Sequence, residues 1–179
     1  MGTPKVHTSR KSTIIGLVGL VAMTTYAVVG TMQILVWNPL AAVPGASLDD
    51  IHRRLGSTGG SLGQPVVLAW AVIGVVLAAL VLALARRLPA TPPTAILAAV
   101  LWLVGLGAPS HFAASFGAGL SLADGYGISG AAYAPWGGVL YLVSTAAFLG
   151  LIALLTITLY TTLTARRAER RHAPTELPG

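Results

Sequence analysis

Residues 65–85 read PVVLAWAVIGVVLAALVLALA, an uncharged run that ends where Arg86 and Arg87 begin. A helix needs about 20 apolar residues to cross the roughly 30 Å hydrocarbon core of a bilayer. This run has that length, so we predict a transmembrane helix here.

The composition of the whole chain agrees with this prediction. The 179 residues are 55% hydrophobic and 9% charged, whereas soluble domains carry about 25% charged residues. The chain has no cysteine, which excludes disulfides, thiolate metal sites and redox-active thiol pairs. Because lipid leaves unpaired backbone groups unsatisfied, we expect an all-α integral membrane protein.

Three further uncharged runs of spanning length lie at 13–37, 93–112 and 138–163. The run at 93–112 is the shortest, and we expect Pro109 to bend or end it. The last run is long enough to cross with tilt or to emerge as a helical stalk. Four spans joined by outer loops at 38–64 and 113–137 predict an antiparallel four-helix bundle.

Small residues in these spans favour close helix packing, which is how helices associate in lipid. The positions that we expect to carry packing are Gly16, Gly19, Gly74, Ala78, Ala146 and Gly150. The same residues could instead mark a face for a partner protein.

The basic residues are distributed asymmetrically about the spans. Nine of the 11 lysines and arginines fall on one side, namely Lys5, Arg10, Lys11, Arg86, Arg87, Arg166, Arg167, Arg170 and Arg171. The positive-inside rule then predicts a multi-pass cell-membrane protein with cytoplasmic segments 1–12 and 164–179. We expect this face to contact anionic lipid headgroups, and no nucleic acid, because the basic residues form no stripe with aromatics. Trp37 and Trp136 fall at the opposite boundary, where indole rings anchor at the headgroups.

The first outer loop predicts a short amphipathic helix at the membrane surface. Ser47 and Asp50 have the spacing of a capping box, and Gly56 is expected to end a helix over 48–55. Leu48, Ile51 and Leu55 then share one face, and the charged residues lie on the other. The second outer loop, 113–137, is apolar and glycine-rich, so we expect it to re-enter the bundle or to form a lid.

Few polar residues lie within the spans, and none at mid-depth is ionisable, which argues against a proton-coupled transporter. Gln33 is the costliest of them to expose to lipid, and we expect it to make an interhelical hydrogen bond or to reach the interface.

The outer face holds a candidate cluster of ionisable residues: Asp49, Asp50, His52, Arg53, Arg54, His111 and Asp124. Asp49 and His52 lie one helical turn apart, so a metal site of two histidines and one or two carboxylates is conceivable. Neither an HExxH nor a GxSxG motif is present, so structural histidines are the favoured interpretation. We predict no catalytic residue, no metal and no cofactor.

Three functions remain open at this point. The first is a non-catalytic accessory or scaffold subunit of a larger membrane assembly, with a protein partner or further copies of itself. The second is a small oligomeric transporter or pore for an apolar or lipid-like solute, with the outer loops as a lid. The third is an outward-facing metal-dependent membrane enzyme that uses His52 and His111.

Overall fold

The structure is a computed structural model that describes residues 10–88 and 90–172, with side chains up to Arg167. Lys5, with the rest of 1–9 of the predicted N-terminal segment, and 173–179 of the predicted C-terminal segment lie outside these residues. Throughout the described ranges the regular structure is helical, and no strand is present. The helices are α1 (Arg10–Met32), the π turn η1 (Gln33–Trp37), α2 (Asn38–Ala42), α3 (Leu48–Ser57), α4 (Gln64–Arg87), α5 (Pro93–Gly105), α6 (Gly107–Tyr126) and α7 (Trp136–His172).

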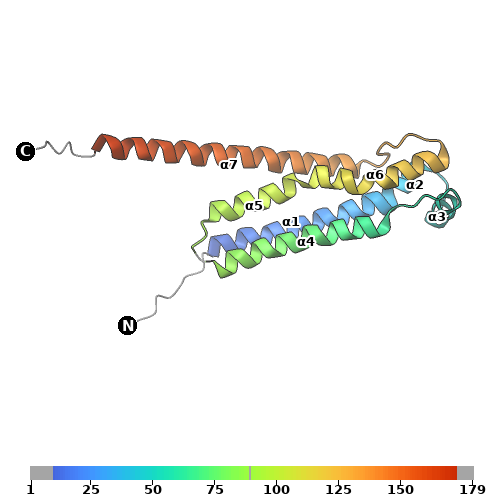
Figure 1. Cartoon of the computed structure of the whole chain (residues 1–179), viewed down its shortest axis with the longest axis horizontal. Helices are drawn as coiled ribbons and strands as arrows, with labels where there is room; N and C mark the ends of the chain where they lie inside the picture. Colours follow the sequence, from blue (N-terminus) through green and yellow to red (C-terminus); the bar gives the residue numbers. More distant parts are fainter. Residues whose placement is uncertain (1–9, 89, 173–179) are drawn as a thin grey trace, which may run out of the picture.

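Four of these helical stretches are long and apolar enough to cross a membrane. They are Arg10–Ala42, Gln64–Arg87, Pro93–Tyr126 and Trp136–Arg167. The prediction of an all-helical chain with four long apolar helices is therefore confirmed. Figure 1 shows these helices lying along one common direction, with α3 and the α6–α7 connection at one end. We call this the loop end.

Small residues let large side chains of the neighbouring helix approach closely, as where Gly19 faces Val100 and Gly74 faces Met23. α1 packs along α4, and α5 lies against both α1 and α7. Of the predicted packing positions, Gly16, Gly19, Gly74 and Ala78 are buried, and Gly150 faces Leu101 of α5. Ala146 is exposed, and its neighbour Ala147 is the buried residue of that turn. Most of the predicted packing positions thus make contacts within the chain.

The third span differs most from the prediction. α5 ends at Gly105, four residues before Pro109, and α6 starts directly afterwards. Pro109 has no N–H for the Gly105 carbonyl and its ring would clash with that group, so the helix breaks here as expected. It does not stop, however, and residues 113–126, which we expected in a loop, continue the helix. The non-helical connection is only 127–135.

The π turn at the end of α1 was not predicted from the sequence. The Asn38 N–H bonds to the carbonyl of Gln33 instead of a residue four positions back. In an α-helix, residues five apart point about 140° away from each other. The wider turn brings Gln33 and Asn38 toward the same side of the helix, and such turns often occur at functional sites.

The predicted short helix in the first loop is present as α3. Its capping box is complete: the Ser47 hydroxyl accepts from the Asp50 N–H, and the Asp50 carboxylate accepts from the Ser47 N–H. The helix runs past Gly56 and ends in a Schellman motif, in which Gly60 bonds to the Leu55 carbonyl at 2.9 Å. Gly59 adopts the left-handed conformation, with φ +76°. Because a helix of this kind ends where a left-handed residue follows it, Gly59 and not Gly56 ends α3.

α3 packs against the rest of the protein. Ile51 and Leu55 are completely buried, in a cluster that includes Leu122 of α6. The Arg54 guanidinium donates from Nε to the Gly125 carbonyl at 3.1 Å, so it binds the C-terminal end of α6, where a cation is favourable. α3 therefore covers the loop end.

Candidate functional site

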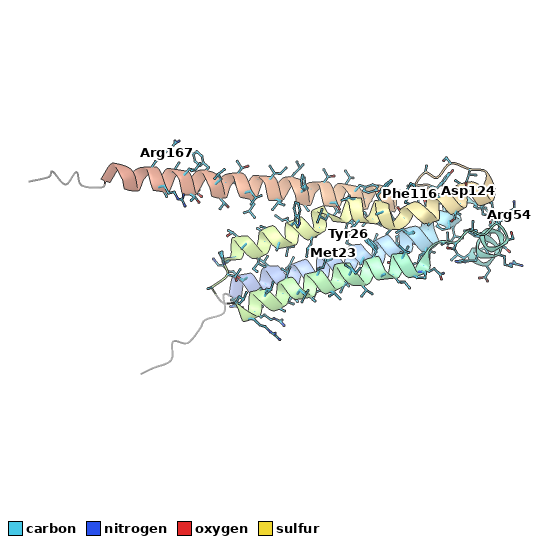
Figure 2. The ribbon with its side chains drawn as sticks, in the orientation of Figure 1. Met23, Tyr26, Arg54, Phe116, Asp124 and Arg167 are labelled. Carbon is cyan, nitrogen blue, oxygen red and sulfur yellow. The ribbon has the colours of Figure 1, made fainter. Side chains whose placement is uncertain are left out.

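The predicted outer-face cluster does not form one site. Among the described residues, no group of three or more histidine, aspartate or glutamate side chains is placed to hold a metal ion. His52 lies against the Leu48 carbonyl, 2.8 Å from Nδ1, and its Nε2 is 3.3 Å from Gln64 Nε2. Asp49 and Asp124 are exposed. Figure 2 shows Arg54 and Asp124 at the loop end, at the surface of the molecule.

Asp50 serves the start of α3. Its carboxylate receives hydrogen bonds from the Ser47 hydroxyl at 2.6 Å and from the Ser47 backbone at 3.2 Å, and it pairs with Arg53. These hydrogen bonds, with the neighbouring Arg53 charge as a smaller cause, hold the pKa of Asp50 below its usual value. Asp50 is therefore the N3 residue of the capping box, and Ser47 is the cap.

His111 lies elsewhere, inside the third span. It sits on α6 and is only 3% exposed, next to Gly30 of α1. Its ring meets Trp70 of α4 and Tyr141 of α7 edge to face, with centroid separations of 5.7 and 5.8 Å. Because the helix continues beyond Pro109, His111 lies near the middle of a helical stretch long enough to cross a membrane, Pro93–Tyr126, whereas we had expected no ionisable residue at mid-depth. Such residues are functional candidates by default.

Neither ring nitrogen of His111 has a hydrogen-bond partner in the part of the chain that the structure describes, although both are buried. The Gln33 side chain is 2% exposed, and its Oε1 is also without a partner. Leaving a buried polar atom unsatisfied costs about 1–3 kcal/mol. Groups of this kind call for an ordered water or a ligand.

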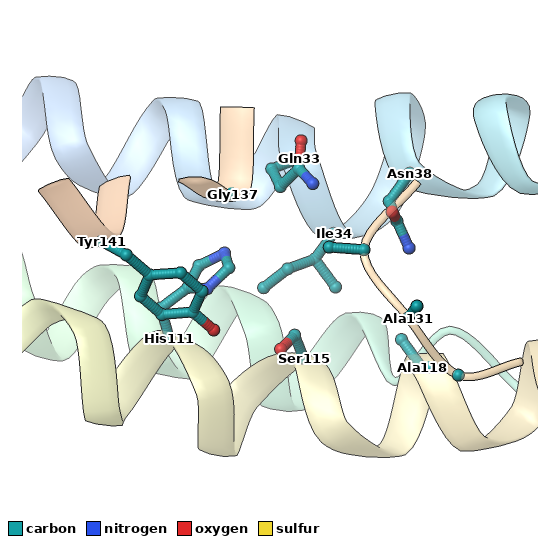
Figure 3. Close-up of a pocket in the computed structure, with 12 residues that line it drawn as sticks. Gln33, Ile34, Asn38, His111, Ser115, Ala118, Ala131, Gly137 and Tyr141 are labelled. Atoms are coloured by element: carbon teal, nitrogen blue, oxygen red, sulfur yellow. The ribbon is translucent and has the colours of Figure 1, made fainter. Parts of the chain in front are cut away.

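Both residues line one cavity of about 60 Å³ at the loop end, which we call the polar pocket. Figure 3 shows the rings of His111 and Tyr141 side by side, Ser115 on α6, and Asn38 near the α6–α7 connection. The full lining is Gln33, Ile34, Asn38, His111, Ser115, Ala118, Gly119, Gly130, Ala131, Ala132, Gly137 and Tyr141.

The 127–135 connection is fastened across this pocket by the π turn. Gln33 donates from Nε2 to the Ala134 carbonyl at 3.2 Å. Asn38 Oδ1 accepts from the Tyr133 N–H at 2.7 Å and the Ala134 N–H at 3.3 Å. Since two backbone donors fix the oxygen of Asn38, its amide NH₂ retains donor capacity. The connection also contacts α6, where a Cβ on Gly119 would lie 3.1 Å from the Gly130 carbonyl oxygen.

A larger cavity of about 590 Å³ adjoins the polar pocket, and we call it the apolar groove. Phe112, Phe116 and Leu120 form its floor along α6, with exposed fractions of 58%, 59% and 51%. The two cavities share the lining residues Ser115, Gly119, Gly130, Ala131, Ala132 and Tyr141. The polar pocket therefore lies directly beside an apolar surface of the kind that faces lipid.

The chemistry that this site offers is hydrogen bonding without charge. Among the described residues, no carboxylate, lysine or arginine lines the polar pocket, so a neutral imidazole, with one donor and one acceptor nitrogen, is the form that it accommodates. The Ser115 hydroxyl donates to the Phe112 carbonyl at 3.0 Å, and not to His111. The described residues thus place no serine–histidine pair here, and the arrangement is suited to binding.

Part of this site was predicted from the sequence. Gln33 and His111 were among the candidate residues, but His111 was assigned to the outer face, and Asn38, Ser115 and Tyr141 were not predicted to belong to a site. A signal was available: Ala114, Ala118 and Leu122, which are buried, recur every four residues beyond Pro109, and this spacing is helical.

No protein-family model, characterised protein or solved structure shows significant similarity to this chain.

Proposed function

We propose that this chain is a non-catalytic membrane protein that binds a small uncharged solute in the polar pocket. The observation that carries the proposal is the set of buried, unpartnered polar atoms, two on His111 and one on Gln33, at one cavity. A ligand that both donates and accepts hydrogen bonds would satisfy them. Of the functions left open by the sequence, handling of a solute is favoured by this geometry over metal-dependent catalysis.

Native mass spectrometry on protein extracted with its own lipids tests this proposal. We expect a bound adduct that disappears in His111→Ala and persists in His52→Ala. His52 is the matched control because it lies at the same end but contacts Leu48 and Gln64 rather than the pocket. A wild-type protein with no adduct, or an adduct that survives in His111→Ala, would overturn the proposal.

The proposal includes an orientation in the membrane. We infer that the four apolar helices cross as an antiparallel bundle, with both termini in the cytoplasm and α3 lying at the outer surface. The arginines that flank the spans support this orientation. The charged outer face of α3 and its buried Ile51 and Leu55 support a helix that lies flat over the loop end.

An accessory role in a larger assembly is a second candidate, and the length of α7 favours it. Gly150 of α7 faces Leu101 of α5, and α5 begins eight residues before Leu101, at Pro93. α7 therefore passes the start of α5 near residue 158 and continues to His172. Figures 1 and 2 show this projection, with Arg167 beyond the ends of the other spans.

The projecting part of α7 has exposed apolar side chains at Leu159, Tyr160 and Leu163. Because isolated helices of this length are marginal in water, we propose that the α7 projection of a second copy packs against it. Disulfide cross-linking of Leu159→Cys and Leu163→Cys in native membranes should give a covalent dimer. Cross-linking no stronger than for Val143→Cys, an exposed α7 position nearer the loop end, would count against this assembly.

A further inference from the structure

We propose that the ligand of the polar pocket is an acylglycerol, a lipid whose small uncharged head bears hydroxyl and ester groups. Its head would occupy the polar pocket and its acyl chain the apolar groove. This inference rests on the proposed function and specifies the class of molecule that the site binds. It is carried by the lining residues that the two cavities share and by the chemistry of each cavity.

The first step concerns the route into the pocket. Phe112, Phe116 and Leu120 lie four residues apart on α6 and all face outward. They form an apolar stripe on a membrane-spanning helix, at the side of the groove that the bilayer would fill. Ser115 and Tyr141 line both cavities, so a molecule lying along the stripe reaches the pocket between them. A lipid would therefore enter sideways from the bilayer rather than through water.

The second step concerns charge. Phosphate and ammonium headgroups would be buried beside His111, Gln33 and Asn38 without a counter-charge among the lining residues. Burial of an unpaired charge is far more costly than burial of a hydrogen-bonded polar group. A hydroxyl group, in contrast, donates to Gln33 Oε1 or an imidazole nitrogen and accepts from the other His111 nitrogen or the Asn38 amide. The pocket thus selects an uncharged head.

The third step concerns size. A buried water needs roughly 10–15 Å³ of cavity volume. The polar pocket, at about 60 Å³, therefore has room for on the order of four to six waters. Glycerol has a comparable number of non-hydrogen atoms, and a sugar headgroup exceeds it. The groove is about ten times larger than the pocket, which is in keeping with an acyl chain.

Photo-cross-linking in nanodiscs tests this inference. A diacylglycerol with a diazirine in its acyl chain should label the α6 peptide that contains residues 112–123 at least tenfold more than the other lipid-facing peptides. A phosphatidylcholine with the same diazirine chain should show no such preference. His111→Ala should abolish the preference, whereas His52→Ala should retain it.

Two further variants keep the test informative if His111→Ala folds poorly. His111→Gln retains an uncharged donor and acceptor, so it should keep part of the preferential labelling. Ser115→Leu places a bulky side chain between pocket and groove and should abolish the preference while the buried His111 is untouched. Preferential labelling that persists in Ser115→Leu would overturn the proposed route.

The failure of this inference can be distinguished from failure of the proposed function. A His111-dependent adduct together with equal labelling by the two lipids overturns the acylglycerol while leaving the binding site in place. An adduct identified as a water-soluble polyol would likewise overturn the acylglycerol and leave the binding site in place. The absence of any adduct overturns both.

Discussion

The role of His111 depends on how tightly its neighbours hold the ring. It is wedged between Trp70 and Tyr141, and Trp70 is itself fixed by a hydrogen bond from Nε1 to the Ser110 hydroxyl at 3.0 Å. Gly30 lies against Trp70 and His111, and its lack of a side chain makes room for these two rings. The two unsatisfied nitrogens are thus held in place rather than free to seek partners, which is the condition for a preorganised binding site.

Gly30→Ala is expected to disturb this arrangement. A Cβ at Gly30 would lie 2.5 Å from Trp70 Cη2 and 3.2 Å from His111 Cδ2, so the indole has to move. Overpacking of this kind typically costs about 1–3 kcal/mol. We expect that loss in the free energy of unfolding, measured in mixed micelles, together with a weaker native adduct. Gly138→Ala lies in helix α7, and no atom lies within 4 Å of the new Cβ. Because alanine favours a helix more than glycine does, this variant should not lower the free energy of unfolding, and a loss equal to that of Gly30→Ala would contradict this explanation.

At the scale of elements, the π turn and the 127–135 connection act as one unit. The Asn38 side chain accepts two hydrogen bonds from the connection, which the Tyr133 and Ala134 N–H groups donate. Asn38→Ala removes both, at about 0.5–1.5 kcal/mol for each hydrogen bond. We expect faster amide hydrogen exchange in 128–135 and little change in α4. Thr24→Ala is the control, because Thr24 bonds only within its own helix, to Leu20. Unchanged exchange in Asn38→Ala would show that the connection is held by other contacts.

α3 provides a second prediction at this scale, through its capping residue. The pKa of Asp50 is lowered in the folded chain, so its contribution to stability is fully present above the unfolded value of about 3.9. That contribution is lost as the pH falls through the lower, folded pKa. Exchange protection in α3 should therefore decline below about pH 4, and Asp50→Asn should weaken it already at pH 7. Asp49→Asn is the matched control, since Asp49 has no part in the capping box; an equal effect would contradict the assignment.

Some of these helices could be predicted from local sequence patterns, and others could not. Runs of apolar residues and the Ser47–Asp50 spacing are local signals, and they predicted the four long apolar helices and α3. The end of the third span was missed because glycine, alanine and serine in 113–126 resemble a loop, while their helical state depends on packing against α3 and α7. The polar pocket was missed for the same reason: Gln33, His111 and Tyr141 are far apart in sequence and meet only once that helix is complete.

The whole molecule has two unlike ends. The loop end carries α3, the polar pocket and the paired rings of Trp37 and Trp136, whose centroids lie 5.4 Å apart. The opposite end carries Arg86 and Arg87 at the end of α4, and α7 projects beyond it. If the acylglycerol proposal is right, this polarity has a functional meaning, because only a loop end that faces outward gives the pocket access to the outer leaflet.

Cysteine labelling would determine this orientation directly. The chain has no cysteine, so each single-cysteine variant is read without background. Ser57 and Thr164 are both exposed and lie at opposite ends. A membrane-impermeant maleimide should label Ser57→Cys in intact cells, and Thr164→Cys only after the membrane is opened, because arginines near a span are retained on the cytoplasmic side. The reverse pattern would place the pocket at the inner leaflet, and labelling of both in intact cells would contradict the odd number of crossings, three, that the candidate spans place between them.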